Sequence, residues 1–196
     1  MSPRQSSSIS AQFVREAMAR VDRARFVPDE LRVHAYEDEA LPIGYEQTIS
    51  QPTMVELLCS ALELRGDETV LDVGTGSGYQ AAVLAELVQE VHTIERIPEL
   101  AERARAALAD RPNVHVHVGD GTLGLPEEAP FDAIAVAAAA AAPPPALLDQ
   151  LRPGGRLVIP IGPPAHQALH VYRDGRVEAG VGCRFVPLVF AQHPPG

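Results

Sequence analysis

The stretch "VLDVGTGSGY", residues 70–79, places three glycines at alternate positions after an apolar run of strand length and before a helical pattern. Glycine accepts the positive φ angles of a tight turn and leaves backbone that no Cβ shields from a ligand. The first turn of the following helix offers N–H groups without intrahelical partners. Such a turn can hold the pyrophosphate of a dinucleotide or the carboxylate end of another cofactor, and it can also bind nothing.

Strand-like and helix-like segments alternate from this turn onward. Apolar runs predict strands at residues 69–73, 91–95, 114–118, 133–136 and 156–161, with helices predicted between them at residues 80–88, 99–109 and 144–151. This alternation indicates an α/β fold with a mostly parallel sheet and helices on both faces. An Asp-Gly pair at residues 174–175 predicts a hairpin, and "RFVPLVF" predicts a further strand, so antiparallel strands are expected near the C-terminus.

The segment before the glycine turn is less regular. Residues 11–21 predict an amphipathic helix outside the sheet, with Phe13 on its apolar face. Residues 25–44 predict irregular structure with at most one short helix. From Pro52 the spacing predicts a helix to about Leu64, with Gly66 as its C-terminal glycine.

The charge of the chain disfavours a nucleic-acid partner. Lys and Arg number 16 against 26 Asp and Glu, a formal net charge of −10 at pH 7, whereas binding to a phosphate backbone needs clustered basic residues. The sequence has no run of about 18 apolar residues that would span a membrane, and its first residues lack the apolar core of a secretory signal. We therefore expect one cytoplasmic domain without a membrane partner.

Neither the cysteines nor the histidines form a metal motif. Cys59 and Cys183 have no CxxC spacing. His115 and His117 alternate with valines on a predicted strand, a pattern typical of the weakly covered face of an edge strand. No metal ligand is predicted.

Two acids follow the next two predicted strands. Glu95 lies 95 − 76 = 19 residues after Gly76, where a carboxylate can accept both ribose hydroxyls of a nucleoside. Asp120, followed by Gly121, ends the third strand, where its carboxylate can accept from an adenine amino group. Two alternatives stay open, namely that Glu95 is a solvated side chain at a strand end and that Asp120 belongs to an ordinary turn.

Together, these signals resemble the S-adenosylmethionine pocket of Rossmann-like class I methyltransferases. More closely, the chain resembles the protein-L-isoaspartate (D-aspartate) O-methyltransferase family over about residues 26–190. The segments that carry the resemblance are "LPIGYEQTISQP", "VLDVGTGSGYQAAVLAELV", "VHTIERIPELAERA", "VGDGTLGLPEEAPFDAI", "LLDQLRPGGRLVIPIG" and "RFVPLV". Of these, "QTISQP" and "GDG" followed by "APFDAI" are the family-specific ones.

The resemblance implies an S-adenosylmethionine-dependent enzyme, with S-adenosyl-L-homocysteine as product. It would methylate the free α-carboxylate of L-isoaspartyl and D-aspartyl residues in damaged proteins and peptides, and the ester would cyclise to a succinimide. The expected partners are isoaspartyl peptides and proteins, and the chain is expected to be a monomer. Two alternatives stay open, namely a methyltransferase for one dedicated biosynthetic peptide and a non-catalytic S-adenosylmethionine-binding protein.

The resemblance also assigns site residues. Thr48 and Ser50 would align the acceptor carboxylate, which is already ionised at neutral pH and needs no general base. Substrate binding is assigned to Thr48, Ile49, Ser50, Gln51, Val186, Pro187 and Leu188. Cofactor binding is assigned to Asp72, Gly74, Thr75, Gly76, Ser77, Gly78, Glu95, Arg96, Asp120 and Gly121. Alternatively, residues 48–50 only cap the helix that follows, with Ser50 as its N-cap.

Two positions depart from the family pattern. Leu125 stands where the family usually has an aromatic residue, which would cost packing area only. Ala137 stands where a threonine is usual, so a hydroxyl is missing near the expected acceptor site, and the substrate preference stays open.

We expect one methyltransferase domain over residues 1–196, with a helical cap and acceptor loop (1–65), a cofactor-binding core (66–165) and C-terminal strands (166–196).

Overall fold

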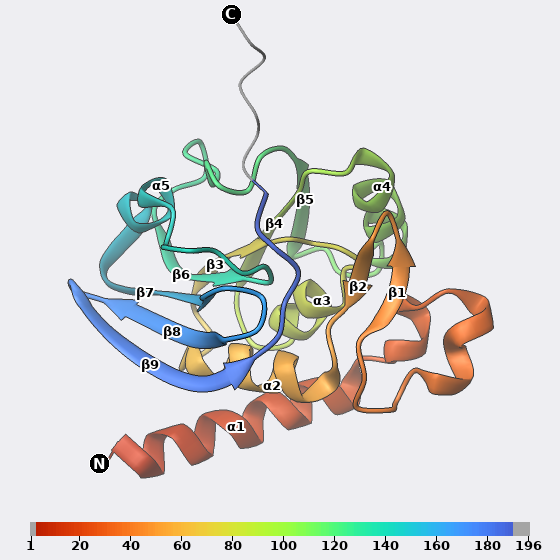
Figure 1. The fold of residues 1–196 in the computed structure, drawn as a ribbon, viewed down its shortest axis with the longest axis horizontal. Coiled ribbons are helices and arrows are strands. Elements are labelled where there is room, and N and C mark those ends of the chain that lie inside the picture. The colour runs from red at the N-terminus through yellow and green to blue at the C-terminus, as the bar shows by residue number, and fades with distance from the viewer. Residues whose placement is uncertain (1–2, 190–196) are drawn as a thin grey trace, which may run out of the picture.

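A seven-stranded sheet organises residues 3–189, the part of the chain that the computed structural model describes (Figure 1). Its strands lie in the order β5-β4-β3-β6-β7-β8-β9. They are β3 (Thr69–Val73), β4 (Glu90–Glu95), β5 (Val114–Val118), β6 (Phe131–Val136), β7 (Leu151–Ile161), β8 (Gln167–Arg173) and β9 (Arg176–Cys183). The strands from β5 to β7 run parallel, and β8 and β9 continue antiparallel. The predicted mixed sheet is confirmed.

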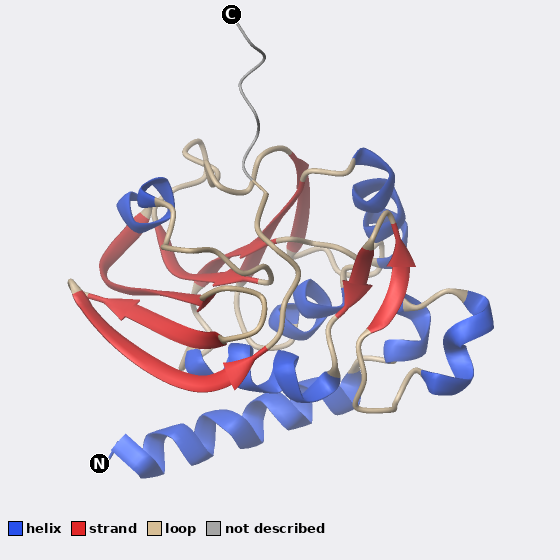
Figure 2. Ribbon diagram, viewed as in Figure 1, coloured by secondary structure: helices blue, strands red, loops and turns tan. Residues whose placement is uncertain are grey.

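Helices cover both faces of this sheet (Figure 2). They are α1 (Pro3–Arg20), α2 (Pro52–Ala61), α3 (Tyr79–Ala85), α4 (Pro98–Ala107) and α5 (Pro145–Asp149), with two short 3-10 helices, η1 (Arg23–Phe26) and η2 (Asp29–His34). Alternate strand residues point to opposite faces. Val70 therefore lies in one core with residues of α1 to α4, and Leu71 lies in a second core with Leu147 of α5. Among residues 3–189, no helix is both long and apolar enough to cross a membrane.

The N-terminal helix is longer than predicted and buries a narrower stripe. α1 begins at Pro3, and its buried side includes Val14 and Ala17. Phe13, predicted on the apolar face, is 57% exposed. Consecutive helix residues are about 100° apart, so Phe13 falls outside the stripe centred on Val14 and Ala17.

Residues 41–49 form a two-stranded hairpin of β1 (Leu41–Gly44) and β2 (Gln47–Ile49). Its first strand lies within residues 25–44, for which irregular structure is predicted, and its second strand lies in the predicted acceptor loop. Tyr45 and Glu46 close the hairpin, with φ angles of 54° and 57°. Two consecutive positive φ angles characterise a type I′ turn, which usually contains Asn or Gly. Tyr45 and Glu46 occupy the two central positions here instead of Asn or Gly, so the sequence does not predict a hairpin.

The start of α2 also differs from the expectation. Its N-cap is Gln51, which makes no side-chain capping bond, and not Ser50. Instead, the Asp38 carboxylate accepts from the Thr53 backbone N–H at 2.8 Å and from the Thr53 hydroxyl at 2.7 Å. An acid distant in sequence therefore satisfies the helix start, which leaves Ser50 outside the capping role.

The end of α2 comes earlier than predicted. The helix ends at Ala61, and the residue after its C-cap, Glu63, has a left-handed φ of 46°. The prediction that Gly66 ends this helix is therefore wrong, because a non-glycine residue takes the left-handed position that glycine usually fills.

Arg23 ties the N-terminal segment to the hairpin. Its side chain is 1% exposed, and its guanidinium donates to the backbone oxygens of Ala35, Glu39 and Ser50. Arginine presents five donors in a planar fork, so one side chain can join three backbone positions. The position of Ser50 is thereby fixed from the side of η1.

We predict that Arg23→Ala lowers the free energy of unfolding by about 3 kcal/mol or more, because three backbone oxygens lose a charged donor and each such bond contributes about 1.5–3 kcal/mol. Urea unfolding measures the loss. The control is Arg25→Ala, whose ion pair with Asp110 is about half exposed and should contribute about 0–1 kcal/mol. Equal losses in both variants would contradict the anchoring role of Arg23.

Candidate active site

A cleft opens at the carboxyl ends of the parallel strands. β4 and β6 lie on opposite sides of β3, so the strand order reverses there, and ligands of open α/β sheets bind at such a point. Its walls include Gly74 after β3, Glu95 at the end of β4 and Ala137 after β6. Residues 47–50 and 186–189 also line it.

The glycine turn has the backbone that its sequence predicts. Gly74, Gly76 and Gly78 have φ angles of 96°, 53° and 91°, which other residues rarely adopt. Residues 74–77 line the cleft, whereas Gly78 does not. A Cβ at Gly78 would come within 3.0 Å of Leu108 Cδ1, so this glycine permits close packing against the end of α4.

Asp72 lies behind the turn, fully buried and outside the lining of the cleft. Its carboxylate accepts from Gln80 Nε2 at 2.7 Å and from Thr93 Oγ1 at 2.8 Å. The Thr93 hydroxyl also lies 2.6 Å from Thr75 Oγ1, within the glycine turn. Burial raises the pKa of Asp72 to about 6, although both hydrogen bonds act to lower it. By this geometry Asp72 positions the turn and does not present its side chain to the cleft.

Glu95 joins the end of β4 to the glycine turn. Its Oε2 accepts from the Gly76 N–H at 2.9 Å, and its Oε1 accepts from the Ile97 N–H at 3.0 Å. Glu95 lines the cleft, as does the exposed Arg96 beside it. Because each carboxylate oxygen has two lone pairs, Glu95 can accept from a ligand while it holds both backbone groups.

The loop after β5 brings Gly121 to the cleft. Asp120 is not part of the lining, and its Oδ1 accepts from the N–H and the hydroxyl of Thr122 at 2.9 and 2.8 Å. A Cβ at Gly121 would lie 2.5 Å from Val73 Cγ1, so a larger residue would push this loop away from β3. The adenine contact assigned to Asp120 stays a prediction.

The hairpin and the residue after it bring hydroxyl groups to the cleft. Thr48, Ile49 and Ser50 all line it, whereas Gln51 does not. Ile49 is buried in the core, Thr48 is exposed and Ser50 is partly buried. Arg23 Nη2 donates to the Ser50 backbone oxygen at 3.0 Å. Both hydroxyl-bearing residues thus belong to a segment that Arg23 anchors.

Residues 184–189 run along the cleft without forming a strand of the sheet, and the last residue of "RFVPLVF" lies outside the described residues. One parallel bridge pairs Pro187 with Ala139. Ala139 N–H donates to Val186 O at 2.8 Å, and Leu188 N–H donates to Ala139 O at 2.7 Å. The prediction of a strand over this segment is therefore wrong. Within residues 3–189, this single bridge is the segment's β-pairing, and one bridge does not make a strand of the sheet. Residues 186–188 do line the cleft, as their assignment requires.

The two departures from the family pattern fall in different places. Ala137 lines the cleft, so the missing hydroxyl belongs to the candidate site. Leu125 is buried in the core on the α5 side, in agreement with a packing role.

The first residues of α3 also line the cleft. Gln80 was not assigned from the sequence, although its place directly after the glycine turn was a usable signal, and Tyr79 precedes it. Burial raises the pKa of Tyr79 to about 12, so its phenol stays neutral at physiological pH.

Comparison with known proteins shows the family to which the chain belongs. The sequence profile of the protein-L-isoaspartate(D-aspartate) O-methyltransferase family matches residues 2–193. The protein-L-isoaspartate O-methyltransferase of Trichlorobacter lovleyi is 54% identical over 184 residues, which cover 90% of this chain and 85% of that protein. The enzyme of that name from Methanothrix thermoacetophila is 54% identical over 181 residues, covering 89% and 86%.

A solved structure supports the same relationship. It is a Plasmodium falciparum protein assigned as a protein-L-isoaspartate O-methyltransferase, in complex with S-adenosyl-L-homocysteine, with a TM-score of 0.77, 26% identity and coverage of 90% of each chain. This likeness confirms the Rossmann-like class I methyltransferase fold. The chain belongs to the protein-L-isoaspartate (D-aspartate) O-methyltransferase family.

Proposed function

We propose that this chain transfers a methyl group from S-adenosylmethionine to the free α-carboxylate of L-isoaspartyl residues, and of D-aspartyl residues, in damaged proteins and peptides. The ester then cyclises to a succinimide, which starts repair. The observation that carries the proposal is a single cleft that joins the glycine turn and Glu95 to the hydroxyl-bearing residues Thr48 and Ser50.

The residues at the glycine turn fit S-adenosylmethionine. A Cβ at Gly74 would lie 3.6 Å from Ala137 Cβ at the wall of the cleft, so its absence leaves room for the methionine end. The Glu95 carboxylate retains lone pairs for ribose hydroxyls. When bound, the cofactor supplies a methyl group on a positively charged sulfur. We assign direct contacts to residues 74–77, Glu95, Arg96, Asp120 and Gly121, and positioning roles to Asp72 and Gly78.

The acceptor carboxylate needs alignment and not activation. A solvated peptide carboxyl group has a pKa of about 4, so the acceptor is an ionised nucleophile at neutral pH. The neutral hydroxyls of Thr48 and Ser50 can fix its orientation without the charge neutralisation that an arginine would bring. The nearby Arg23 donates to backbone oxygens, which supports the assignment of the acceptor to the two hydroxyls and not to an arginine. Orientation alone contributes up to about 7–11 kcal/mol in favourable cases.

A peptide substrate would use the outer side of residues 186–188. Val186 O and Leu188 N–H already bond to Ala139, and the backbone groups of an extended segment alternate in direction. The Pro187 carbonyl therefore points to the other side, where it can accept from a peptide N–H. Proline has no N–H to donate to the peptide, so side-chain contacts must contribute the rest of the binding free energy.

One observation favours a second candidate. Ala137 lies at the cleft, and the absent hydroxyl is compatible with a methyltransferase for one dedicated peptide.

The one-domain organisation over 1–196, of which residues 1–2 and 190–196 lie outside the described part, stays a prediction. A monomeric state, the lack of a nucleic-acid partner and a cytoplasmic location stay predictions as well.

Methyl transfer to a matched peptide pair tests the proposal. We expect labelled S-adenosylmethionine to give a base-labile methyl ester on a peptide with isoaspartate at one position and none on the same peptide with aspartate. Labelling of neither peptide, together with methylation of a different acceptor, would refute the proposed substrate. Cofactor binding without any turnover would favour the non-catalytic alternative.

Ser50→Ala separates the acceptor role from the cofactor role. We predict a fall in kcat of about 10- to 100-fold, because the acceptor carboxylate loses one hydrogen bond to a charged group, worth about 1.5–3 kcal/mol. The dissociation constant of S-adenosyl-L-homocysteine, measured by calorimetry, should change by less than about threefold. Equal losses in turnover and affinity would show that Ser50 is assigned to the wrong end of the cleft.

Glu95→Ala should weaken the binding of S-adenosyl-L-homocysteine by on the order of 1.5–3 kcal/mol for each lost hydrogen bond to the charged group. The variant also removes the partner of the Gly76 and Ile97 N–H groups, so its unfolding must be measured in parallel. Glu99→Ala is the matched control, since this exposed glutamate lies four residues further along the chain, in the first turn of α4. Unchanged affinity in a folded Glu95→Ala protein would remove Glu95 from the cofactor site.

A further inference from the structure

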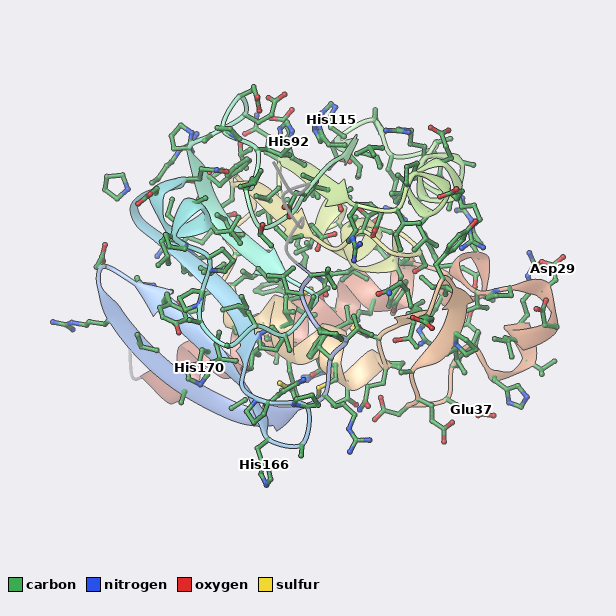
Figure 3. The ribbon with its side chains drawn as sticks, turned by 45° about the horizontal axis from the view of Figure 1, so that its top comes forward. Asp29, Glu37, His92, His115, His166 and His170 are labelled. Atoms are coloured by element: carbon green, nitrogen blue, oxygen red, sulfur yellow. The ribbon has the colours of Figure 1, made fainter. Side chains whose placement is uncertain are left out.

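Three potential metal ligands meet at the β5 edge of the sheet. They are His92 of β4, His117 of β5 and Glu128 of the loop between β5 and β6, and their ligand atoms all lie within 4.8 Å of one another. Figure 3 shows His92 and His115 together at this edge, far from His166. None of the three residues lines the cleft described above.

Strand register explains why two of them meet. β4 and β5 pair in parallel, with His92 opposite His115 and Ile94 opposite His117. Residues two apart on a strand share a face, so all three imidazoles lie on the α5 side of the sheet. The His92 ring is therefore flanked by the rings of His115 and His117, with centroids at 5.0 and 5.4 Å.

We propose that His92, His117 and Glu128 bind a divalent transition-metal ion of the zinc class. His92 Nδ1 lies 3.2 Å from His117 Nε2. Two nitrogens at 2.0–2.1 Å from a tetrahedral zinc ion are about 3.3 Å apart, so both rings are already at the separation of two ligands. Without an ion, the same two nitrogens share one N–H···N hydrogen bond between neutral rings.

The surroundings favour this ion class. Two imidazoles with one carboxylate suit zinc and its neighbours, whereas magnesium requires mainly oxygen ligands. The Glu90 carboxylate lies 3.8 Å from His92 Nε2, on the side where histidine ligands often have a carboxylate partner. His115 Nε2 is 3.0 Å from Glu90, which leaves His115 outside the ligand set. Burial lowers the pKa of His92 and of His117, and a metal ion binds the neutral form of a histidine ring.

The site would link the loop after β5 to the sheet. Residues 119–130 connect β5 to β6 and include Gly121 of the cleft, and Glu128 is their contribution to the ion. A bound ion would therefore restrain this loop at the end opposite Gly121. The consequence is structural, and it does not depend on the proposed methyl transfer.

Calorimetry with zinc chloride on the chelator-treated protein, without a histidine tag, tests the site. We expect one zinc ion per chain and no binding of magnesium at the same concentration. His117→Ala should weaken zinc binding more than about tenfold, because loss of a group that only hydrogen-bonds a ligand already costs about 10- to 100-fold. Because Glu128 is exposed, Glu128→Gln should fold normally and also weaken binding, so it carries the test if His117→Ala does not fold.

His166→Ala is the matched control, since this exposed histidine lies in the loop between β7 and β8. Its zinc affinity should equal that of the unchanged protein. Zinc binding of the same strength in the unchanged protein and in folded His117→Ala or Glu128→Gln would overturn the proposal. A loss in His166→Ala as large as in those variants would overturn it too.

Discussion

The buried carboxylate of Asp72 is the interaction on which the cofactor end of the cleft depends. It accepts from Gln80 of α3 and from Thr93 of β4, and Thr93 in turn contacts Thr75 of the glycine turn. Burying an ionised group is costly unless hydrogen bonds compensate for lost water, and the pKa of about 6 reflects this balance. At neutral pH the group is mainly ionised and holds both donors. The turn is therefore shaped before a ligand arrives, which reduces the ordering that binding would require.

Arg23 has the corresponding role at the acceptor end. It is a buried cation close to a cleft proposed to bind an anionic acceptor, yet its guanidinium donates to the backbone oxygens of Ala35, Glu39 and Ser50. The positive charge therefore anchors the loop and is not offered to the substrate. Neutral hydroxyls are left to orient the carboxylate, and this arrangement preserves its nucleophilicity.

The sheet and the cofactor turn were predictable from the sequence because their signals are local. β3 and β5 match their predicted bounds, since each is a short valine-rich run that a glycine follows. The hairpin at residues 41–49 was not predictable, because Tyr45 and Glu46 adopt a turn that usually contains Asn or Gly. The anchoring by Arg23 left no side-chain pattern, since its partners are backbone atoms 12 to 27 residues away. The meeting of His92 with Glu128 likewise exists only in the folded chain.

The central claim is that the chain aligns an already ionised acceptor and needs no general base. The most direct measurement is the pH dependence of methyl transfer to an isoaspartyl peptide in a single turnover. The account predicts a rate constant that is flat from about pH 7 to about pH 9, since the acceptor is fully ionised over that range. A rate constant that rises about tenfold per pH unit toward a plateau in that range would reveal a titrating base and would contradict the account.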